Sequence, residues 1–198
     1  MMYLRSGLSY LRRGAIFGIM THLLTSIILA YFLVDPRNLL VDIRKILPQT
    51  ILLVSIPFLS FLLLFIKAAS LLRRFDVRLG IGRAGLFLEL IGLLIILLWI
   101  FTSPVSDSRT EFISWILTFL PLFFGALLLF LGGLGFSMMV MMLGEIEGLE
   151  EGFRLAGIIY MAGIFFSLTI PIAGQAMNLL SMILIYVYSR RSLRSKFN

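Results

Sequence analysis

Residues 80–101 read "GIGRAGLFLELIGLLIILLWIF", three glycines followed by an almost unbroken apolar run. Gly80, Gly82 and Gly85 have the G-x-G-x-x-G spacing of a dinucleotide-binding turn, in which glycines let the backbone approach a pyrophosphate. Such a turn also needs an acidic residue about 20 positions further on to bind the ribose. The residues at 99–101 are "WIF" instead. The stretch therefore predicts a transmembrane helix and no nucleotide site.

The composition of the whole chain also indicates a membrane protein. Of its 198 residues 60% are hydrophobic and only 14% are charged, and the mean hydropathy is +1.06. A soluble domain carries about 25% charged residues, because water must solvate its surface. We therefore expect an integral membrane protein that has the lipid bilayer as a partner.

The chain is strongly basic, with a net charge of +7 from 17 lysines and arginines against ten acidic residues. These basic residues flank the apolar segments, where such residues orient a membrane protein and contact anionic headgroups. We therefore expect no nucleic-acid partner.

Residue types that support metal and redox chemistry are scarce. The chain has no cysteine and one histidine, which excludes disulfides, thiolate metal sites and a haem held by two of its own histidines. The acidic run at 145–151 lacks the geometry of a cation-binding loop, so we expect it to pair with the basic loop at 67–83 or with another subunit. We predict no catalytic residue, no cofactor and no metal site.

Apolar segments define the membrane spans, since crossing a hydrocarbon core of about 30 Å takes about 20 helical residues. The predicted segments are 15–34, 49–66, 84–101, 112–143 and 156–188. The last segment is ambiguous, because it contains Pro171 and the stretch "PIAG". It is either one long kinked helix or a hairpin of two short helices.

Two arguments about this last segment disagree. With the N-terminus inside, five spans place nine basic residues inside and eight outside, whereas six spans place 13 inside and four outside. The positive-inside rule prefers six. Against it, each half of the hairpin has only about 14 to 18 apolar residues, which is short for a crossing.

We therefore predict an all-α fold, a polytopic transmembrane helix bundle of five spans, with six as the alternative. It forms a single domain over residues 1–198. We place it in the cell membrane with the N-terminus cytoplasmic.

Three sequence stretches resemble a known family. They are "GLSYLRRGAIFGI" (7–19), "LRRFDVRLGIGRAGLFLELIGLLIILL" (72–98) and "LGEIEGLEEGFRLAGI" (143–158). Together they resemble a family of small archaeal multi-pass membrane proteins that is known as a domain of unknown function. The resemblance implies the same membrane architecture and an archaeal source, and it implies no activity.

Small and polar residues recur on one face of several spans. Gly14 and Gly18 share a face of the first span, and Gly85 and Gly92 share a face of the third. In the last segment the stripe comprises Gly163, Ser167, Pro171, Gly174, Gln175, Asn178 and Ser181. Such residues let helices approach closely and form hydrogen bonds between them. Helix packing is the main interpretation of all three faces.

Four polar residues within spans are candidate functional residues: His22, Glu89, Gln175 and Asn178. His22 and Glu89 lie at similar depths, so they could form a pair that relays a proton or binds a cationic solute. In the alternative, which we prefer, Glu89 has a structural role close to the headgroups and forms an ion pair with Arg83 or Arg78.

The glycines at 80–85 also have an interpretation. Gly80 and Gly82 predict a tight turn back into the membrane, and Gly85 predicts close contact with a neighbouring helix. Arg78 and Arg83 stand beside this helix start and are candidate contacts for a lipid phosphate.

These features favour a non-catalytic structural or accessory subunit that packs against other membrane-protein subunits or against a second copy of itself. The alternative is a small transporter or channel component for a proton or a small cationic solute, using the four polar residues. A lipid-modifying enzyme would need a cluster of carboxylates, histidines or serines at the interface, and only the acidic run at 145–151 offers candidates, so we predict that the protein is not an enzyme.

Overall fold

The structure, a computed structural model, describes residues 1–34, 43–102 and 112–197. In these ranges the chain forms six long α-helices and one short 3₁₀ helix, without strands. The elements are α1 (Met2–Val34), α3 (Ile43–Phe75), η1 (Val77–Leu79), α4 (Gly80–Thr102), α5 (Phe112–Leu143), α6 (Gly152–Thr169) and α7 (Pro171–Phe197). Each α-helix is long and apolar enough to cross a membrane. The protein is a multi-pass, all-α helical bundle, as predicted.

The last apolar segment is a hairpin, so our preference for five spans is wrong. Helix α6 ends at Thr169 and α7 begins at Pro171, and Ile170 between them has φ −131° and ψ 81°, outside the helical region. Proline has no backbone N–H and keeps the residue before it away from helical angles, which ends α6. Helices α6 and α7 then pack against each other. The part of the chain that the structure describes thus has the six spans of the alternative.

The length argument failed because a short helix can still reach across most of the hydrocarbon core. Helix α6 has 18 residues, which extend for about 27 Å at 1.5 Å per residue. The hairpin also contains its own turn, since the N–H of Ile170 still donates to the carbonyl of Phe166 at 2.7 Å. The basic-residue count was therefore the better guide than the length of each half.

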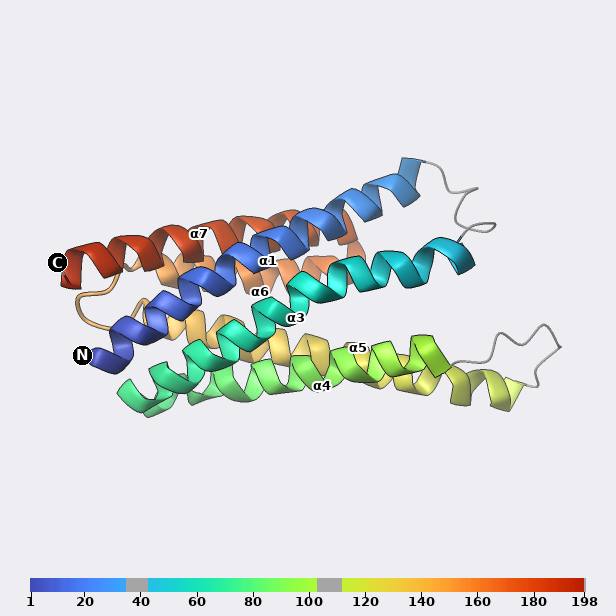
Figure 1. Ribbon diagram of the computed structural model, residues 1–198, viewed down its shortest axis with the longest axis horizontal. Helices are drawn as coiled ribbons and strands as arrows, with labels where there is room; N and C mark the ends of the chain where they lie inside the picture. The colour runs from blue at the N-terminus through green and yellow to red at the C-terminus, as the bar shows by residue number, and fades with distance from the viewer. Residues whose placement is uncertain (35–42, 103–111, 198) are drawn as a thin grey trace.

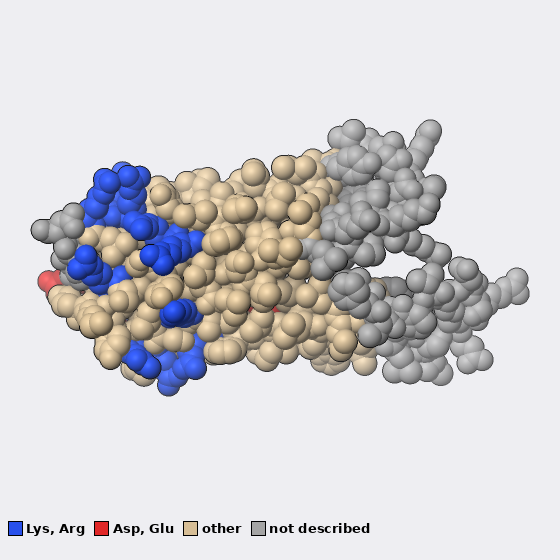
Figure 2. Space-filling view, viewed as in Figure 1, with Lys and Arg blue, Asp and Glu red and all other residues tan. Residues whose placement is uncertain are grey.

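Both termini lie at the same end of the bundle (Figure 1). In the space-filling view, lysines and arginines gather at this end, and the middle of the molecule is almost free of charge (Figure 2). We call it the basic end. An even number of spans places both termini on one side, and the positive-inside rule expects the basic residues to gather on a single side.

The core at the basic end includes residues of α1, α3, α5 and α7. On α1 the buried apolar positions are Leu4, Leu8, Leu11 and Ala15, which repeat at helical spacing on one face. Phe65 of α3 fills the space opposite Gly14 of α1, where an added Cβ would collide with its ring. Phe65 also stacks on Phe136 of α5 with ring centroids 4.7 Å apart. Aromatic side chains thus join α1, α3 and α5.

Helices α4 and α5 pack with their backbones in contact. A Cβ atom added to Gly85 would lie 2.5 Å from the carbonyl oxygen of Gly132, and one added to Gly92 would lie 2.6 Å from that of Gly125. Two β-carbons could not be accommodated without separating the helices. The interpretation of this glycine face as a packing face is confirmed.

The predicted glycine turn before α4 is wrong. Asp76 makes the turn instead: its carboxylate accepts a hydrogen bond from the backbone N–H of Arg78 at 2.9 Å and caps η1. Gly80 has a helical φ of −62° and begins α4. Gly82 lies within the helix and faces Met139. Both glycines are therefore positions of helix contact and not of backbone reversal.

We expect cysteines introduced at Ser6 and Ser195 to be labelled from the same side of the membrane, because both ends of the chain lie at the basic end. The measurement is labelling with a membrane-impermeant maleimide in sealed, right-side-out and inside-out vesicles, with detergent-permeabilised vesicles as the reference for full labelling. Labelling of the two positions from opposite sides would contradict the hairpin.

We expect Gly85→Ala to destabilise the protein by roughly 1–3 kcal/mol, the usual effect of overpacking, because the carbonyl of Gly132 cannot move away. Gly18→Ala should cost less, since the atom nearest to its added Cβ, 2.8 Å away, is the flexible Met182 Sδ. Leu94→Ile, at an exposed position of α4, is the control. The thermal midpoint in detergent measures all three. Equal midpoints for Gly85→Ala and the control would refute the backbone contact.

Candidate functional site

Three of the four candidate residues line one pocket. Glu89 of α4 and Gln175 and Asn178 of α7 line it, and its volume is about 270 Å³. The fourth, His22 of α1, stands behind Gln175, with His22 Nδ1 and Gln175 Oε1 2.7 Å apart. We call this site the Glu89 pocket.

The walls of the Glu89 pocket come from α3 to α7 and are mainly apolar. Phe58, Leu129, Phe130, Ile164 and Leu168 supply the apolar surface. A concave, mostly apolar site with a few convergent polar groups is the usual form of a small-molecule binding site.

Glu89 is inserted between α4 and α5 at a place that glycines leave open. A Cβ added to Gly132 would lie 2.5 Å from Glu89 Cγ, and one added to Gly133 would lie 3.4 Å from Glu89 Oε1. Only 3% of Glu89 is exposed. It lies six residues beyond Arg83 in the sequence, or about 9 Å further along the helix. Glu89 is therefore well inside the apolar part of the bundle.

Neither carboxylate oxygen of Glu89 has a hydrogen-bond partner among the described residues. An ionised carboxylate without a partner is very unfavourable in an apolar medium. Ionisable residues inside membrane spans are accordingly rare and mark functional sites by default. Glu89 is the residue on which the interpretation of the pocket depends.

The arginines that we expected to pair with Glu89 lie elsewhere. Arg78 forms an ion pair with Asp76, with Nη2 and Oδ2 2.8 Å apart, and its guanidinium hydrogen bond lowers the pKa of Asp76. Arg83 lies over the ring of Phe87, 5.6 Å from the ring centre. The predicted pairing is wrong because Glu89 shares its helix face with Gly85, which packs against α5.

These positions bear on the predicted lipid-phosphate contact as well. The Arg78 guanidinium already has a carboxylate partner in Asp76. For Arg83, the interaction that the structure gives is the contact with the ring of Phe87. A phosphate would have to compete with Asp76 for Arg78. The contact at Arg78 and Arg83 stays a prediction.

His22 and Glu89 do not form the direct pair that we considered. His22 is 8% exposed and hydrogen-bonds to Gln175. If Oε1 of Gln175 is the acceptor, His22 carries its proton on Nδ1. Its ring also meets the ring of Tyr160 edge-on, with centroids 6.3 Å apart. Tyr160 lines the Glu89 pocket too, so it connects the surroundings of His22 with those of Glu89.

Tyr160 is a pocket residue that the sequence analysis missed. It lies on α6 three and seven residues before Gly163 and Ser167, which belong to the predicted polar stripe. Residues at this spacing share a helix face. Extending the stripe by one turn toward the start of α6 would have included it.

Asn178 contributes a second acceptor without a partner. Its Oδ1 is buried and makes no hydrogen bond within the described parts of the chain. Gly163 of α6 lies directly against this side chain, where a Cβ atom would not fit. The Glu89 pocket therefore contains two sets of unsatisfied acceptor atoms, from Glu89 and from Asn178. Such a lining suits a ligand that carries hydrogen-bond donors and positive charge.

The bundle and its pocket define a class: a multi-pass helical membrane protein with a mainly apolar pocket between its spans, lined also by a buried carboxylate residue and a buried amide residue. No family model, curated protein or solved structure matches the chain. The interpretation of the pocket therefore follows from its geometry and chemistry.

We expect the His22–Gln175 hydrogen bond to stabilise the packing of α1 on α7. His22→Ala and Gln175→Leu should each lower the thermal midpoint in detergent, with a coupling energy of ~0.6 kcal/mol and at most ~1.7 kcal/mol in a double-mutant cycle. Ser26→Ala is the control, because its hydroxyl bonds to the carbonyl of His22 within α1. Strict additivity of the two substitutions would show that the hydrogen bond contributes nothing.

Proposed function

We propose that this protein binds a small cationic solute in the Glu89 pocket and acts as a small transporter or channel component. The observation that carries the proposal is the buried carboxylate of Glu89, a residue that lines the pocket; neither carboxylate oxygen has a partner among the described residues. A bound cation would supply the missing positive charge. Because most of the pocket lining is apolar, the attraction between the two charges would be stronger there than in solution.

The size and lining of the pocket support a small organic cation. Its volume of about 270 Å³ is just below the range for ligand sites, which begins at ~300 Å³. Phe58, Phe130 and Tyr160 place aromatic rings in the walls. Aromatic rings attract ammonium groups through cation–π interactions. An ammonium ion with a few carbon atoms matches both the charge and the size.

The broken last segment supports access to the pocket from the end opposite the termini. The turn between α6 and α7 stops short of the far ends of α1, α3, α4 and α5 (Figure 1). Ser167, Leu168 and Gln175 line the pocket and lie close to that turn in the sequence. Discontinuous helices line the substrate sites of many transporters.

The accessory-subunit role stays a prediction, and the glycine faces no longer favour it. Gly14 and Gly18 of α1 face Phe65 and Met182, and Gly85 and Gly92 of α4 face α5. These faces are therefore used for packing within the chain. Nothing about them requires a second subunit.

We also propose a location and an orientation. The protein would lie in the cell membrane with its basic end in the cytoplasm, because six spans put 13 basic residues on the side of the termini and four on the other. The N-terminus and the C-terminus would both be cytoplasmic. The resemblance to an archaeal family is consistent with this architecture and stays a prediction.

Binding of methylammonium tests the proposed function. We expect wild-type protein in detergent to bind it saturably, measured as a rise in thermal midpoint and by calorimetry. Glu89→Gln keeps the shape of the side chain and removes its charge, so it should weaken binding at least tenfold. Proteoliposomes should show uptake of labelled methylammonium by the wild type and none by Glu89→Gln.

Glu151→Gln is the matched control, because Glu151 is an exposed carboxylate outside the pocket. It should leave binding and uptake unchanged. Acetamide, a neutral molecule of similar size, should not compete. Equal methylammonium binding by wild type and Glu89→Gln, or no saturable binding by the wild type, would refute the proposal.

A further inference from the structure

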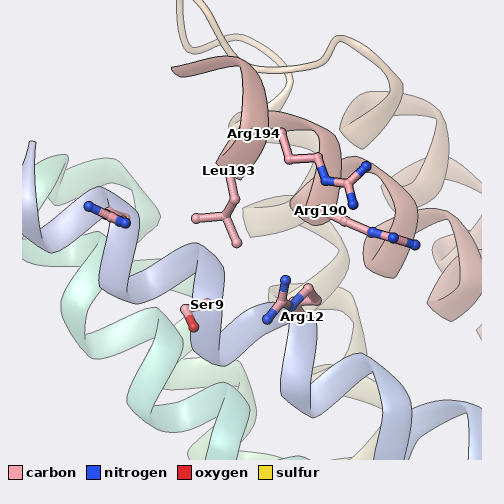
Figure 3. A pocket seen from close by; sticks show the side chains of 6 residues that line it. Ser9, Arg12, Arg190, Leu193 and Arg194 are labelled. Carbon is pink, nitrogen blue, oxygen red and sulfur yellow. The ribbon is translucent and has the colours of Figure 1, made fainter. Parts of the chain in front are cut away.

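A second pocket lies at the basic end, between the start of α1 and the end of α7 (Figure 3). It is lined by Arg5, Ser9, Arg12, Arg190, Leu193 and Arg194, and its volume is about 270 Å³. We call it the arginine pocket. It shares no lining residue with the Glu89 pocket.

Helical spacing explains why these residues meet. Arg5, Ser9 and Arg12 follow one another at intervals of four and three residues on α1, which places them on one helix face. On α7, Arg190 and Arg194 are one turn apart. Helices α1 and α7 pack against each other, and in the close-up the labelled side chains of the two helices border a common space (Figure 3).

The arginine pocket concentrates positive charge without a carboxylate in its lining. Among the described residues, the structure gives no ion pair or hydrogen bond to the guanidinium groups of Arg12, Arg190 and Arg194. The acidic loop after α5 meets α7 through a different residue, since the N–H of Glu150 donates to Ser192 Oγ at 3.4 Å. Guanidinium groups that share a small pocket repel each other, so an anion bound there would stabilise the packing of α1 on α7.

The depth of the pocket matches that of lipid headgroups. Arg12 is followed, after Arg13, by the uncharged stretch 14–34, and Arg190 follows the uncharged stretch 171–189. Arginines at the ends of membrane spans extend toward the headgroup region. Basic pockets between transmembrane helices at this level are typical binding sites for anionic lipid headgroups.

We propose that the arginine pocket binds the phosphate group of an anionic phospholipid. Arg12, Arg190 and Arg194 hold its oxygens, because the planar guanidinium donates two parallel hydrogen bonds to a phosphate. The hydroxyl of Ser9 can donate one more. Leu193 adds apolar surface to the lining, which suits the glycerol part of a lipid better than a free ion. Inorganic phosphate shares the recognised group, so it is the necessary comparison.

Native mass spectrometry of the full-length protein in detergent tests the proposal. The probes are dioctanoyl phosphatidylglycerol, dioctanoyl phosphatidylcholine and inorganic phosphate. We expect one phosphatidylglycerol to bind in preference to the other two. The triple variant Arg12→Gln, Arg190→Gln, Arg194→Gln should weaken this binding at least tenfold. The single variant Arg194→Gln, at an exposed position, should weaken it measurably if the triple variant does not fold.

A second triple variant, Arg13→Gln, Arg73→Gln, Arg154→Gln, is the control. It removes the same charge from exposed positions outside the arginine pocket, and it should bind phosphatidylglycerol like the wild type. An equal loss in both triple variants would show attraction by net charge alone and overturn the site. Inorganic phosphate binding as tightly as phosphatidylglycerol would overturn the assignment to a lipid. If Arg194→Gln and the first triple variant both bind phosphatidylglycerol as tightly as the wild type, the whole proposal is overturned.

Discussion

The close approach of α4 and α5 determines much of the rest of the structure. Inside a bilayer, helices gain little from burying apolar surface, because lipid is as apolar as the side chains. Contact between their backbones is then a principal source of stability. Gly85 with Gly132 and Gly92 with Gly125 make that contact possible. Gly132, together with Gly133, also leaves the space in which the side chain of Glu89 lies, so packing and the pocket have a common origin.

The two pockets differ in the charge of their polar groups and in their position along the bundle. The Glu89 pocket lies among the apolar segments and presents unsatisfied acceptors from Glu89 and Asn178. The arginine pocket lies at the basic end and presents donors. In α-helices the backbone groups bond mainly to one another, as a bilayer requires. Sites for charged ligands must therefore be built from side chains, and this protein has two such groups of side chains, one in each pocket.

The span pattern could be read from the sequence, because length and apolarity act locally. The same reasoning underestimated the hairpin at Pro171, where the distribution of arginines along the whole chain was more informative than the length of each half. The candidates His22, Glu89, Gln175 and Asn178 were also identifiable, since polar residues within spans turn inward. Their partners were not. The contact of His22 with Gln175 depends on α1 lying beside α7, and these helices are at opposite ends of the sequence.

The arginine pocket was unpredictable for the same reason, as half of it comes from each end of the chain. The glycine turn was misjudged because glycine permits both a reversal and close helix packing, and the sequence does not distinguish the two uses. Asp76 capped η1 and left Gly80 and Gly82 free for packing. Tyr160 was missed because its aromatic ring counts as apolar in a span, although its hydroxyl is polar.

The shortness of α6 has a consequence for the surrounding lipid. Helix α5 has 32 residues and α6 has 18, so the hydrophobic length that the protein presents to the bilayer differs from one side to the other. Such hydrophobic mismatch is relieved when the bilayer thins locally or when the longer helices tilt, at a modest free-energy cost per ångström. Where the bilayer thins to match α6, the hydrocarbon region beside α6 is thinner than that beside α5. Bilayer thickness, set by acyl-chain length, therefore determines how closely the lipid matches the hydrophobic length of this side of the molecule.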